Sequence, residues 1–268
     1  MKKLIKAKKK FGQNFLIDKS ILNRIIQSMP NNSNKLVEIG PGLGDLTEKL
    51  VKYKDTLAYE VDTDLISILK SKFAIELDNG RFQLIHTDVL TAWEEAGSLY
   101  ENKYDLVANL PYYIATNIIL RAIEDDNCEN ILVMIQKEVA LKFSAKENEK
   151  EFSSLGVIAS LCSKENGILF DVPPESFDPP PKVMSSILYI KKDMGVKLDK
   201  GFLKFLKVCF SQPRKKLFKN LSNIYDKELL SNIYSDLDLI ETLRPHELSA
   251  SLYSQMYTKV NNGKQRNK

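Results

Sequence analysis

The run DLVANLPYYIATN, residues 105–117, contains residue types that can carry chemistry. An apolar stretch ends there in an asparagine, a proline and two tyrosines. Pro111 fixes the turn and lacks an amide donor, so the carbonyls of Asn109 and Leu110 can point outward instead of pairing in a sheet. Amide and carbonyl oxygens beside the Tyr112 ring form a site for an amine attached to a flat ring, since the oxygens accept the amine protons and the phenol stacks.

A second candidate is the glycine-rich turn within LVEIGPGLGDLTEKL, residues 36–50. Gly40, Gly42 and Gly44 have GxGxG spacing and lack the third glycine of a GxGxxG dinucleotide fingerprint. Small residues after a strand allow the backbone to approach a ligand closely. Taken alone, the pattern is equally typical of a tight structural turn.

Two carboxylates follow at matching positions along the chain. Glu60 ends the next predicted strand, 20 residues after Gly40, where a carboxylate can accept both hydroxyls of a ribose. Asp88 follows the third strand and is placed to accept from an adenine amine, while the Val89 N–H can donate to the ring. The alternative for Asp88 is a helix cap. Together these residues predict a nucleoside site at one edge of a sheet.

The elements that position these residues alternate between strand and helix. This alternation predicts an α/β fold with a seven-stranded, mostly parallel sheet covered on both faces. A proline-rich, non-helical connection precedes the last strand, which is therefore expected to be antiparallel. The predicted strands are residues 35–39, 56–60, 82–86, 104–108, 130–136, 166–172 and 184–190.

Beyond about Asp193 the strand pattern stops and helical spacing takes over. We therefore expect two domains, residues 1–193 and a small all-helical domain of residues 194–268. Residues 191–268 hold 16 Lys and Arg against 8 Asp and Glu, and residues 1–10 hold six lysines. Basic ends around an acidic middle suggest a polyanion held at a rim. The alternative is that these lysines are simply solvated.

Composition limits the classes of function. Three cysteines without CxxC spacing and two histidines argue against a disulfide framework or a metal centre. No apolar run approaches the roughly 18 residues typical of a membrane span. The protein is expected to be cytoplasmic, without a metal and without a membrane partner.

Several motifs together resemble a known family. The motifs are KKKFGQNFL (8–16), VEIGPGLGDLT (37–47), NLPYYIAT (109–116), QKEVA (136–140), FDPPPKVMSS (177–186), RKKLFKNLS (214–222) and RPHELS (244–249). In this order they are similar to the bacterial small-subunit (16S) ribosomal RNA adenine dimethyltransferases. The resemblance implies a class I methyltransferase (Rossmann-like) domain with an antiparallel last strand, followed by a helical RNA-binding domain. It also implies S-adenosyl-L-methionine as cofactor.

The resemblance further implies a reaction and a set of site residues. The reaction is dimethylation of N6 on two adjacent adenines near the 3′ end of 16S ribosomal RNA, in immature small subunits, by a monomer. The base would stack between Tyr112 and Phe177, although Phe177 would otherwise be interpreted as a core residue beneath a loop. The catalytic residues expected are Asn109, Leu110, Pro111, Tyr112 and Phe177. The cofactor residues are Asn14, Leu16, Gly40, Gly42, Glu60, Asp88, Val89 and Asn109, and the RNA-binding residues are Lys8, Lys9, Lys10, Arg214, Lys215, Lys216 and Lys219.

Three alternatives remain at the level of sequence. A large-subunit ribosomal RNA adenine methyltransferase of the antibiotic-resistance type shares the core and an NLPY-like turn, but RKKLFKNLS and RPHELS argue against it. An RNA-binding assembly factor without turnover is disfavoured by the intact NLPY turn. A nicotinamide oxidoreductase is disfavoured because the chain shows no catalytic Tyr/Lys or His arrangement.

Overall fold

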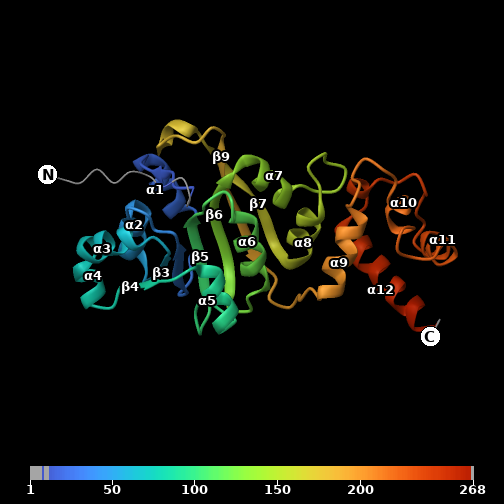
Figure 1. The fold of residues 1–268 in the computed structure, drawn as a ribbon, viewed down its shortest axis with the longest axis horizontal. Helices are drawn as coiled ribbons and strands as arrows, with labels where there is room; N and C mark the ends of the chain where they lie inside the picture. Colours follow the sequence, from blue (N-terminus) through green and yellow to red (C-terminus); the bar gives the residue numbers. More distant parts are fainter. Residues whose placement is uncertain (1–7, 9–11, 267–268) are drawn as a thin grey trace. The chain divides into compact units, whose positions relative to one another are not determined.

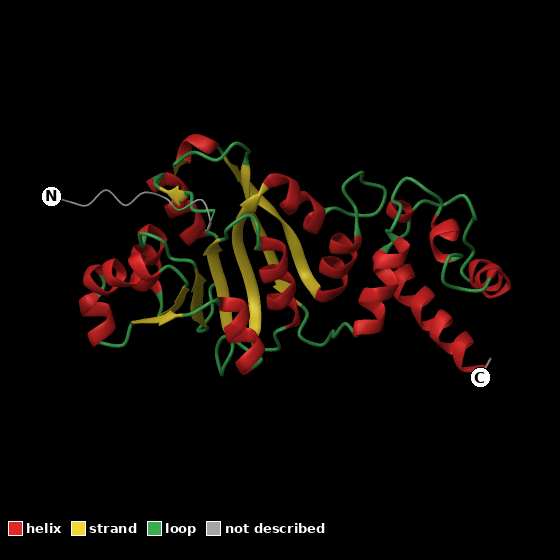
Figure 2. Cartoon of the chain, viewed as in Figure 1, coloured by secondary structure: helices red, strands yellow, loops and turns green. Residues whose placement is uncertain are grey.

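The computed structural model describes residues 8 and 12–266 (Figure 1). The chain divides into two compact units. The first unit comprises residues 1–140 and 167–192, and the second comprises residues 141–166 and 193–268. The sequence predicted two contiguous domains that meet at residue 193. In the structure residues 141–166 instead group with the C-terminal helices. In Figure 2 the strands gather in the first unit, while the C-terminal part of the chain is helical.

A seven-stranded sheet forms the centre of the first unit, in the order β4-β3-β2-β5-β6-β9-β7. β2, β3, β4, β5 and β6 pair in parallel, and β9 pairs antiparallel with β6, with Met134 opposite Ile187. The predicted mostly parallel sheet with an antiparallel last strand is confirmed. The strands are β2 (Lys35–Ile39), β3 (Thr56–Glu60), β4 (Phe82–His86), β5 (Tyr104–Asn109), β6 (Cys128–Gln136), β7 (Ser163–Val172) and β9 (Ser185–Lys192).

Helices precede, connect and follow the parallel strands. α1 begins after Asp18, whose carboxylate accepts from the Ser20 and Ile21 amides, as expected for an N-cap. Its residues Ile21, Leu22, Ile25 and Ile26 are buried. The helices are α1 (Lys19–Gln27), α2 (Asp45–Tyr53), α3 (Thr63–Lys72), α4 (Ala74–Asp78), α5 (Val89–Ala96), α6 (Ala115–Glu124) and α7 (Lys137–Ser144), with a short 3₁₀ turn, η2 (Pro174–Ser176).

A two-stranded pairing ties the N-terminal segment to the proline-rich loop. β1 (Phe15–Leu16) pairs antiparallel with β8 (Phe177–Asp178), with Leu16 opposite Phe177. Both of these side chains belong to one buried cluster that also includes Leu36 and Val107 of the central strands. This pairing places residues 12–16 beside the carboxyl edge of the parallel strands.

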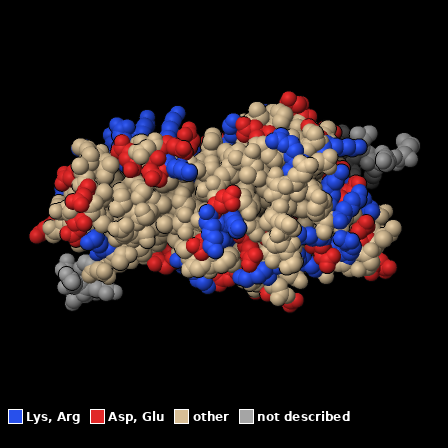
Figure 3. Space-filling model, turned by 180° about the vertical axis from the view of Figure 1, so that it is seen from behind, with Lys and Arg blue, Asp and Glu red and all other residues tan. Residues whose placement is uncertain are grey.

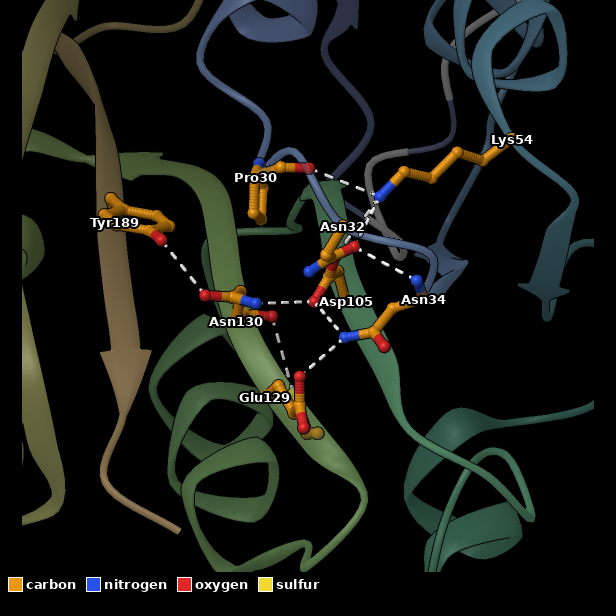
Figure 4. Close-up of polar contacts among 9 residues, drawn as sticks. Pro30, Asn32, Asn34, Lys54, Asp105, Glu129, Asn130 and Tyr189 are labelled. Atoms are coloured by element: carbon orange, nitrogen blue, oxygen red, sulfur yellow. Dashed lines mark hydrogen bonds and ion pairs between the residues drawn. The ribbon is translucent and has the colours of Figure 1, made fainter.

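A buried polar network lies at the other end of the central strands, near the first residues of β5 and β6 (Figure 4). The fully buried Asp105 accepts from the side-chain amides of Asn34, at 3.0 Å, and Asn130, at 2.7 Å. Its second oxygen lies 3.6 Å from Lys54 Nζ, and the Tyr189 hydroxyl donates to Asn130 Oδ1 at 3.0 Å. Because these residues come from β5, β6, β9 and the segments beside β2 and β3, the network fixes several strands relative to one another.

The second unit contains the remaining helices. In it α8 packs against α12, and Phe152 meets Phe210 edge to face with ring centroids 6.4 Å apart. The helices are α8 (Ser154–Cys162), α9 (Lys200–Cys209), α10 (Leu217–Leu221), α11 (Lys227–Asp236) and α12 (Ala250–Arg266), with a short 3₁₀ turn, η3 (Pro245–Glu247). Among the residues that the structure describes, none of the helices is both long and apolar enough to cross a membrane.

Candidate active site

A cavity opens at the carboxyl edge of the parallel strands. Its walls come from the segment before α1 and from the turns that follow β2, β3, β4 and β5, where open α/β sheets bind ligands. Nearly all of the predicted cofactor and catalytic residues line this one cavity. They are Asn14, Leu16, Gly40, Gly42, Glu60, Asp88, Val89, Asn109, Leu110, Pro111 and Tyr112.

The glycine turn uses backbone conformations that favour glycine. Gly40 and Gly42 have φ values of +67° and +60°. A Cβ at Gly42 would lie 3.1 Å from Cδ1 of Phe15, so this position also lacks room for a side chain. The Gly42 N–H donates to Glu60 Oε2 at 3.2 Å, which links the turn to the end of the neighbouring strand.

Glu60 is fixed at the end of β3. Its second oxygen, Oε1, accepts from the Asp62 amide at 2.8 Å, and the side chain is buried. Burial raises the pKa of the Glu60 carboxyl, and backbone hydrogen bonds from Asp62, Gly42 and Val61 oppose that shift. A carboxylate held in this way presents its remaining lone pairs to the cavity in a fixed direction.

Asp88 caps a helix and also lines the cavity. Its Oδ1 accepts from the Leu90 amide at 2.8 Å at the start of α5, which confirms the cap alternative. The side chain is nevertheless exposed, and the neighbouring Val89 is buried against the cavity wall. Capping and ligand contact are therefore compatible at this position, because each carboxylate oxygen has two acceptor directions.

Asn109 is the last residue of β5, and its side chain reaches the N-terminal segment. Its Nδ2 donates to the Asn14 carbonyl at 3.0 Å, which leaves the amide oxygen as an available acceptor. Next along the turn, the Leu110 amide donates to the Met134 carbonyl at 3.1 Å, and the Ile114 amide donates to the Pro111 carbonyl at 3.2 Å. These hydrogen bonds fix the turn to β6 and to the N-terminal segment.

The two tyrosines of the turn have different environments. The Tyr112 hydroxyl lies 2.6 Å from Ser185 Oγ, and partial burial raises the pKa of the phenol. Tyr113 is 61% exposed and lies against Gly12 at the mouth of the cavity. Tyr113 therefore does not pack beneath the turn.

Phe177 occupies a different place from the one predicted. Its ring is only 3% exposed and packs in the core cluster with Leu16 and Ile187. It is absent from the cavity lining. The β1–β8 pairing turns this side chain inward, so the structure matches the core interpretation and gives no support to a stacking role.

A buried acid that sequence reasoning missed also lines the cavity. Glu38 is fully enclosed in β2, and its Oε2 accepts from the Thr47 hydroxyl at 2.7 Å. Burial raises the pKa of Glu38 to about 8, and the nearby Glu60 acts in the same direction. The available signal was an acidic residue inside the otherwise apolar strand that leads into the glycine turn.

The predicted RNA-binding lysines at the N-terminus are only partly described. Lys8 forms ion pairs with Asp62, at 2.5 Å, and Asp64, at 2.6 Å. Burial raises the pKa of Asp62, but hydrogen bonds from Lys8 and Gln13 outweigh it and hold that pKa below its usual range. Through these ion pairs Lys8 anchors the segment that lines the cavity. Lys9 and Lys10 lie outside the described residues.

The C-terminal basic residues lie around the start of α10. All four predicted positions, Arg214, Lys215, Lys216 and Lys219, are exposed. On the face drawn in Figure 3, lysine and arginine side chains stand in groups among acidic ones. Within the described residues, no cluster of three or more His, Cys, Asp or Glu side chains has an arrangement that could hold a metal ion.

Comparison with known proteins identifies the family of this chain. The family model described as "Ribosomal RNA adenine dimethylase" matches residues 4–261. The chain belongs to the ribosomal RNA adenine dimethylase family. It is therefore a methyltransferase, and S-adenosylmethionine is its cofactor.

Named relatives agree with this family. "Ribosomal RNA small subunit methyltransferase A" of Aliarcobacter butzleri is 68% identical over 260 residues, which cover 97% of this chain and 98% of the relative. The protein of the same name from Campylobacter fetus is 50% identical over 263 residues, which cover 97% of each chain. The resemblance found from sequence motifs is confirmed.

Solved structures show the same fold. A dimethyladenosine transferase from Plasmodium falciparum matches with a TM-score of 0.79 and 23% identity, covering 92% of this chain and 98% of that one. The 23S ribosomal RNA methyltransferase ErmE matches with a TM-score of 0.71 and 21% identity, covering 92% and 100%. The predicted Rossmann-like fold is confirmed.

Proposed function

We propose that this protein dimethylates N6 of two adjacent adenines near the 3′ end of 16S ribosomal RNA. The observation that carries the proposal is the fixed Asn109 side chain at the cavity edge, donating to Asn14 and offering its oxygen to a ligand. The names of the relatives, which specify the small subunit, support the choice of RNA.

The cavity residues fit the cofactor. S-adenosylmethionine supplies a methyl group already activated by its sulfonium. The buried Glu60 carboxylate would accept from the ribose hydroxyls, and Asp88 with the Val89 amide would recognise the adenine. At Gly40 nothing lies within 4 Å of the place that a Cβ would take, which leaves room for the cofactor beside the backbone. Asn14 and Leu16 close the cavity from the N-terminal side.

The target amine is a poor nucleophile because its lone pair is delocalised into the purine ring. Hydrogen bonds from the two amine protons to Asn109 Oδ1 and to the Leu110 or Pro111 carbonyl would favour a pyramidal nitrogen aimed at the methyl group. The Pro111 carbonyl already accepts from Ile114, so Leu110 is the better second acceptor. The methylated amine then loses its proton to solvent, and no dedicated base is required.

The target base must leave its stack to reach the cavity. Extrusion costs a few kcal/mol, and one aromatic stacking contact returns about 1–3 kcal/mol. Tyr112, which lines the cavity, is placed to supply that contact. Two rounds of methylation require that the same acceptors also accommodate the singly methylated amine.

The proposal extends to the oligomeric state, the location and the RNA partner of the protein. We infer that the protein acts as a monomer in the cytoplasm on immature small subunits. The exposed basic residues Arg214, Lys215, Lys216 and Lys219 would contact RNA phosphates. The division into a methyltransferase domain and a helical RNA-binding domain belongs to the same proposal.

The deciding experiment is methylation of purified ribosomal subunits. Immature small subunits, mature small subunits and large subunits are each incubated with the protein and methyl-labelled S-adenosylmethionine, and the modified bases are mapped. We expect dimethylation of two adjacent adenines in the immature small subunit. Label confined to large subunits would establish the antibiotic-resistance type of reaction instead, and particle binding without label would establish an assembly factor without turnover.

A further inference from the structure

The hydrogen bond between Tyr112 and Ser185 joins the candidate catalytic turn to a distant strand. The Tyr112 hydroxyl lies 2.6 Å from Ser185 Oγ, across 73 positions of sequence. Tyr112 lines the cavity, whereas Ser185 is fully buried at the first position of β9. A ring that only stacked on a base would gain nothing from this bond, since phenylalanine stacks equally well.

The serine is itself rigidly placed. Ser185 pairs with Gln136 at the end of the antiparallel β6–β9 ladder. The next residue, Ser186, is also fully buried and donates to Asp171 Oδ1 at 2.6 Å. The other oxygen of Asp171 accepts from Lys137 Nζ at 2.6 Å, and the Lys137 amide donates to the Met184 carbonyl at 3.0 Å. The start of β9 is therefore held on both sides.

Tyr112 is consequently fixed at its two ends. Its backbone belongs to the turn that Pro111 and the Leu110–Met134 hydrogen bond hold in place, and its hydroxyl is held by Ser185. A side chain bonded at its far end loses freedom about both of its rotatable bonds. The plane of the ring is then set before the base arrives, which avoids an ordering cost at the moment of binding.

We propose that Ser185 is a positioning residue that sets the plane on which the Tyr112 ring receives the target base. This inference rests on the proposed function and deepens it. The ring supplies the stacking surface, and Ser185 determines its orientation relative to the Asn109 and Leu110 acceptors. Ser185 touches neither cofactor nor substrate in this account.

The test is a double-mutant cycle of Tyr112→Phe and Ser185→Ala, measured on small subunits that lack the modification. Each single variant is expected to lower kcat about tenfold, with KM for the particle and affinity for S-adenosylhomocysteine changed less than twofold. The double variant should also lose about tenfold instead of the hundredfold expected of independent sites, because both changes remove the same bond.

Thr56→Val is the matched control. It removes a fully buried hydroxyl that donates to the Lys54 carbonyl at 3.0 Å at the first position of β3, the end of that strand away from the cavity. We expect it to lower Tm as much as Ser185→Ala does while keeping wild-type kcat. If Tyr112→Phe and Ser185→Ala lower Tm but keep full kcat at a temperature where both are folded, the bond is only structural and the inference fails. Failure of the wild-type protein to methylate the particle would instead overturn the proposed function.

Discussion

The Asn109 side chain donates to the Asn14 carbonyl at 3.0 Å and so connects the end of β5 to the segment that closes the cavity. The bond orients the amide, because the nitrogen is committed to Asn14 and the oxygen faces the other way. A fixed acceptor of this kind is expected to matter more for the reaction than for cofactor affinity.

Replacing Asn109 tests this expectation. Asn109→Ala should lower kcat by about 10²–10³, the usual loss when one hydrogen bond to the transition state is removed. Affinity for S-adenosylhomocysteine should change less than about tenfold, measured by calorimetry. The exposed Asn102, changed to Ala, serves as the control and should leave both quantities unaltered. Near-normal turnover of Asn109→Ala would refute the acceptor role.

Gly42 should tolerate no side chain. Gly42→Ala places a Cβ at φ +60° and 3.1 Å from the Phe15 ring. Besides about 1–2 kcal/mol of backbone strain, we expect at least a tenfold loss of affinity for S-adenosylhomocysteine, because the turn and residues 12–16 must shift together. Gly80→Ala is the control, since Gly80 has φ +79° with nothing within 4 Å of a Cβ. Gly80→Ala should lose comparable stability and keep its affinity for S-adenosylhomocysteine. Equal losses of affinity in the two variants would contradict a role of the Gly42 turn in cofactor binding.

Glu38 should make stability depend on pH. Its pKa is raised by burial to about 8 from a usual value of 4.5, so the folded state binds more protons than the unfolded state between these values. The contribution of Glu38 to the free energy of unfolding is fully present below about pH 4.5. It decreases as pH rises and is lost above about pH 8. The slope is at most about 1.4 kcal/mol per pH unit.

Glu38→Gln removes that dependence while keeping a polar group beside Thr47. Relative to the wild-type protein, the variant should therefore gain unfolding free energy as pH is raised from 5.5 to 8.5, measured by urea denaturation without cofactor. Glu95→Gln, at an exposed position on α5, should give a curve parallel to that of the wild-type protein. A constant difference between Glu38→Gln and wild type at every pH would show that Glu38 does not titrate in this range.

The exposed basic residues near α10 should make RNA binding sensitive to salt. If about six phosphates are neutralised, affinity for small subunits should fall by roughly two to three decades between 50 and 200 mM salt. Changing Arg214, Lys215 and Lys216 together to Ala should reduce the slope of log affinity against log salt by about 2–3. The charge-preserving control exchanges Arg for Lys, and Lys for Arg, at the same positions and should keep the wild-type slope. A flat salt response of the wild-type protein would exclude this surface.

Much of the sheet could be predicted because its strands are apolar, rich in branched side chains and bounded by turns. The predicted strands at residues 35–39, 56–60 and 82–86 coincide with β2, β3 and β4. The site followed from topology, since parallel strands bring the residues after them to one edge. β1 and β8 were not predicted because two-residue strands have no periodicity.

The surroundings that the sequence did not reveal depend on long-range partners. Phe177 is buried because it pairs across the chain with Leu16, and no local pattern records that pairing. Lys8 belongs to an N-terminal lysine run, yet it anchors to Asp62, 54 residues away. Glu38 was overlooked because its role depends on Thr47 and on burial, which composition does not reveal.

The chain passes from one unit to the other at residues 140, 166 and 192, and this order has a consequence for synthesis on the ribosome. Helix α8 emerges long before α12, the helix against which it packs. The face of α8 that packs against α12 stays without this partner while roughly a hundred further residues are translated. During that interval the nascent chain exposes a helix face that the folded protein covers.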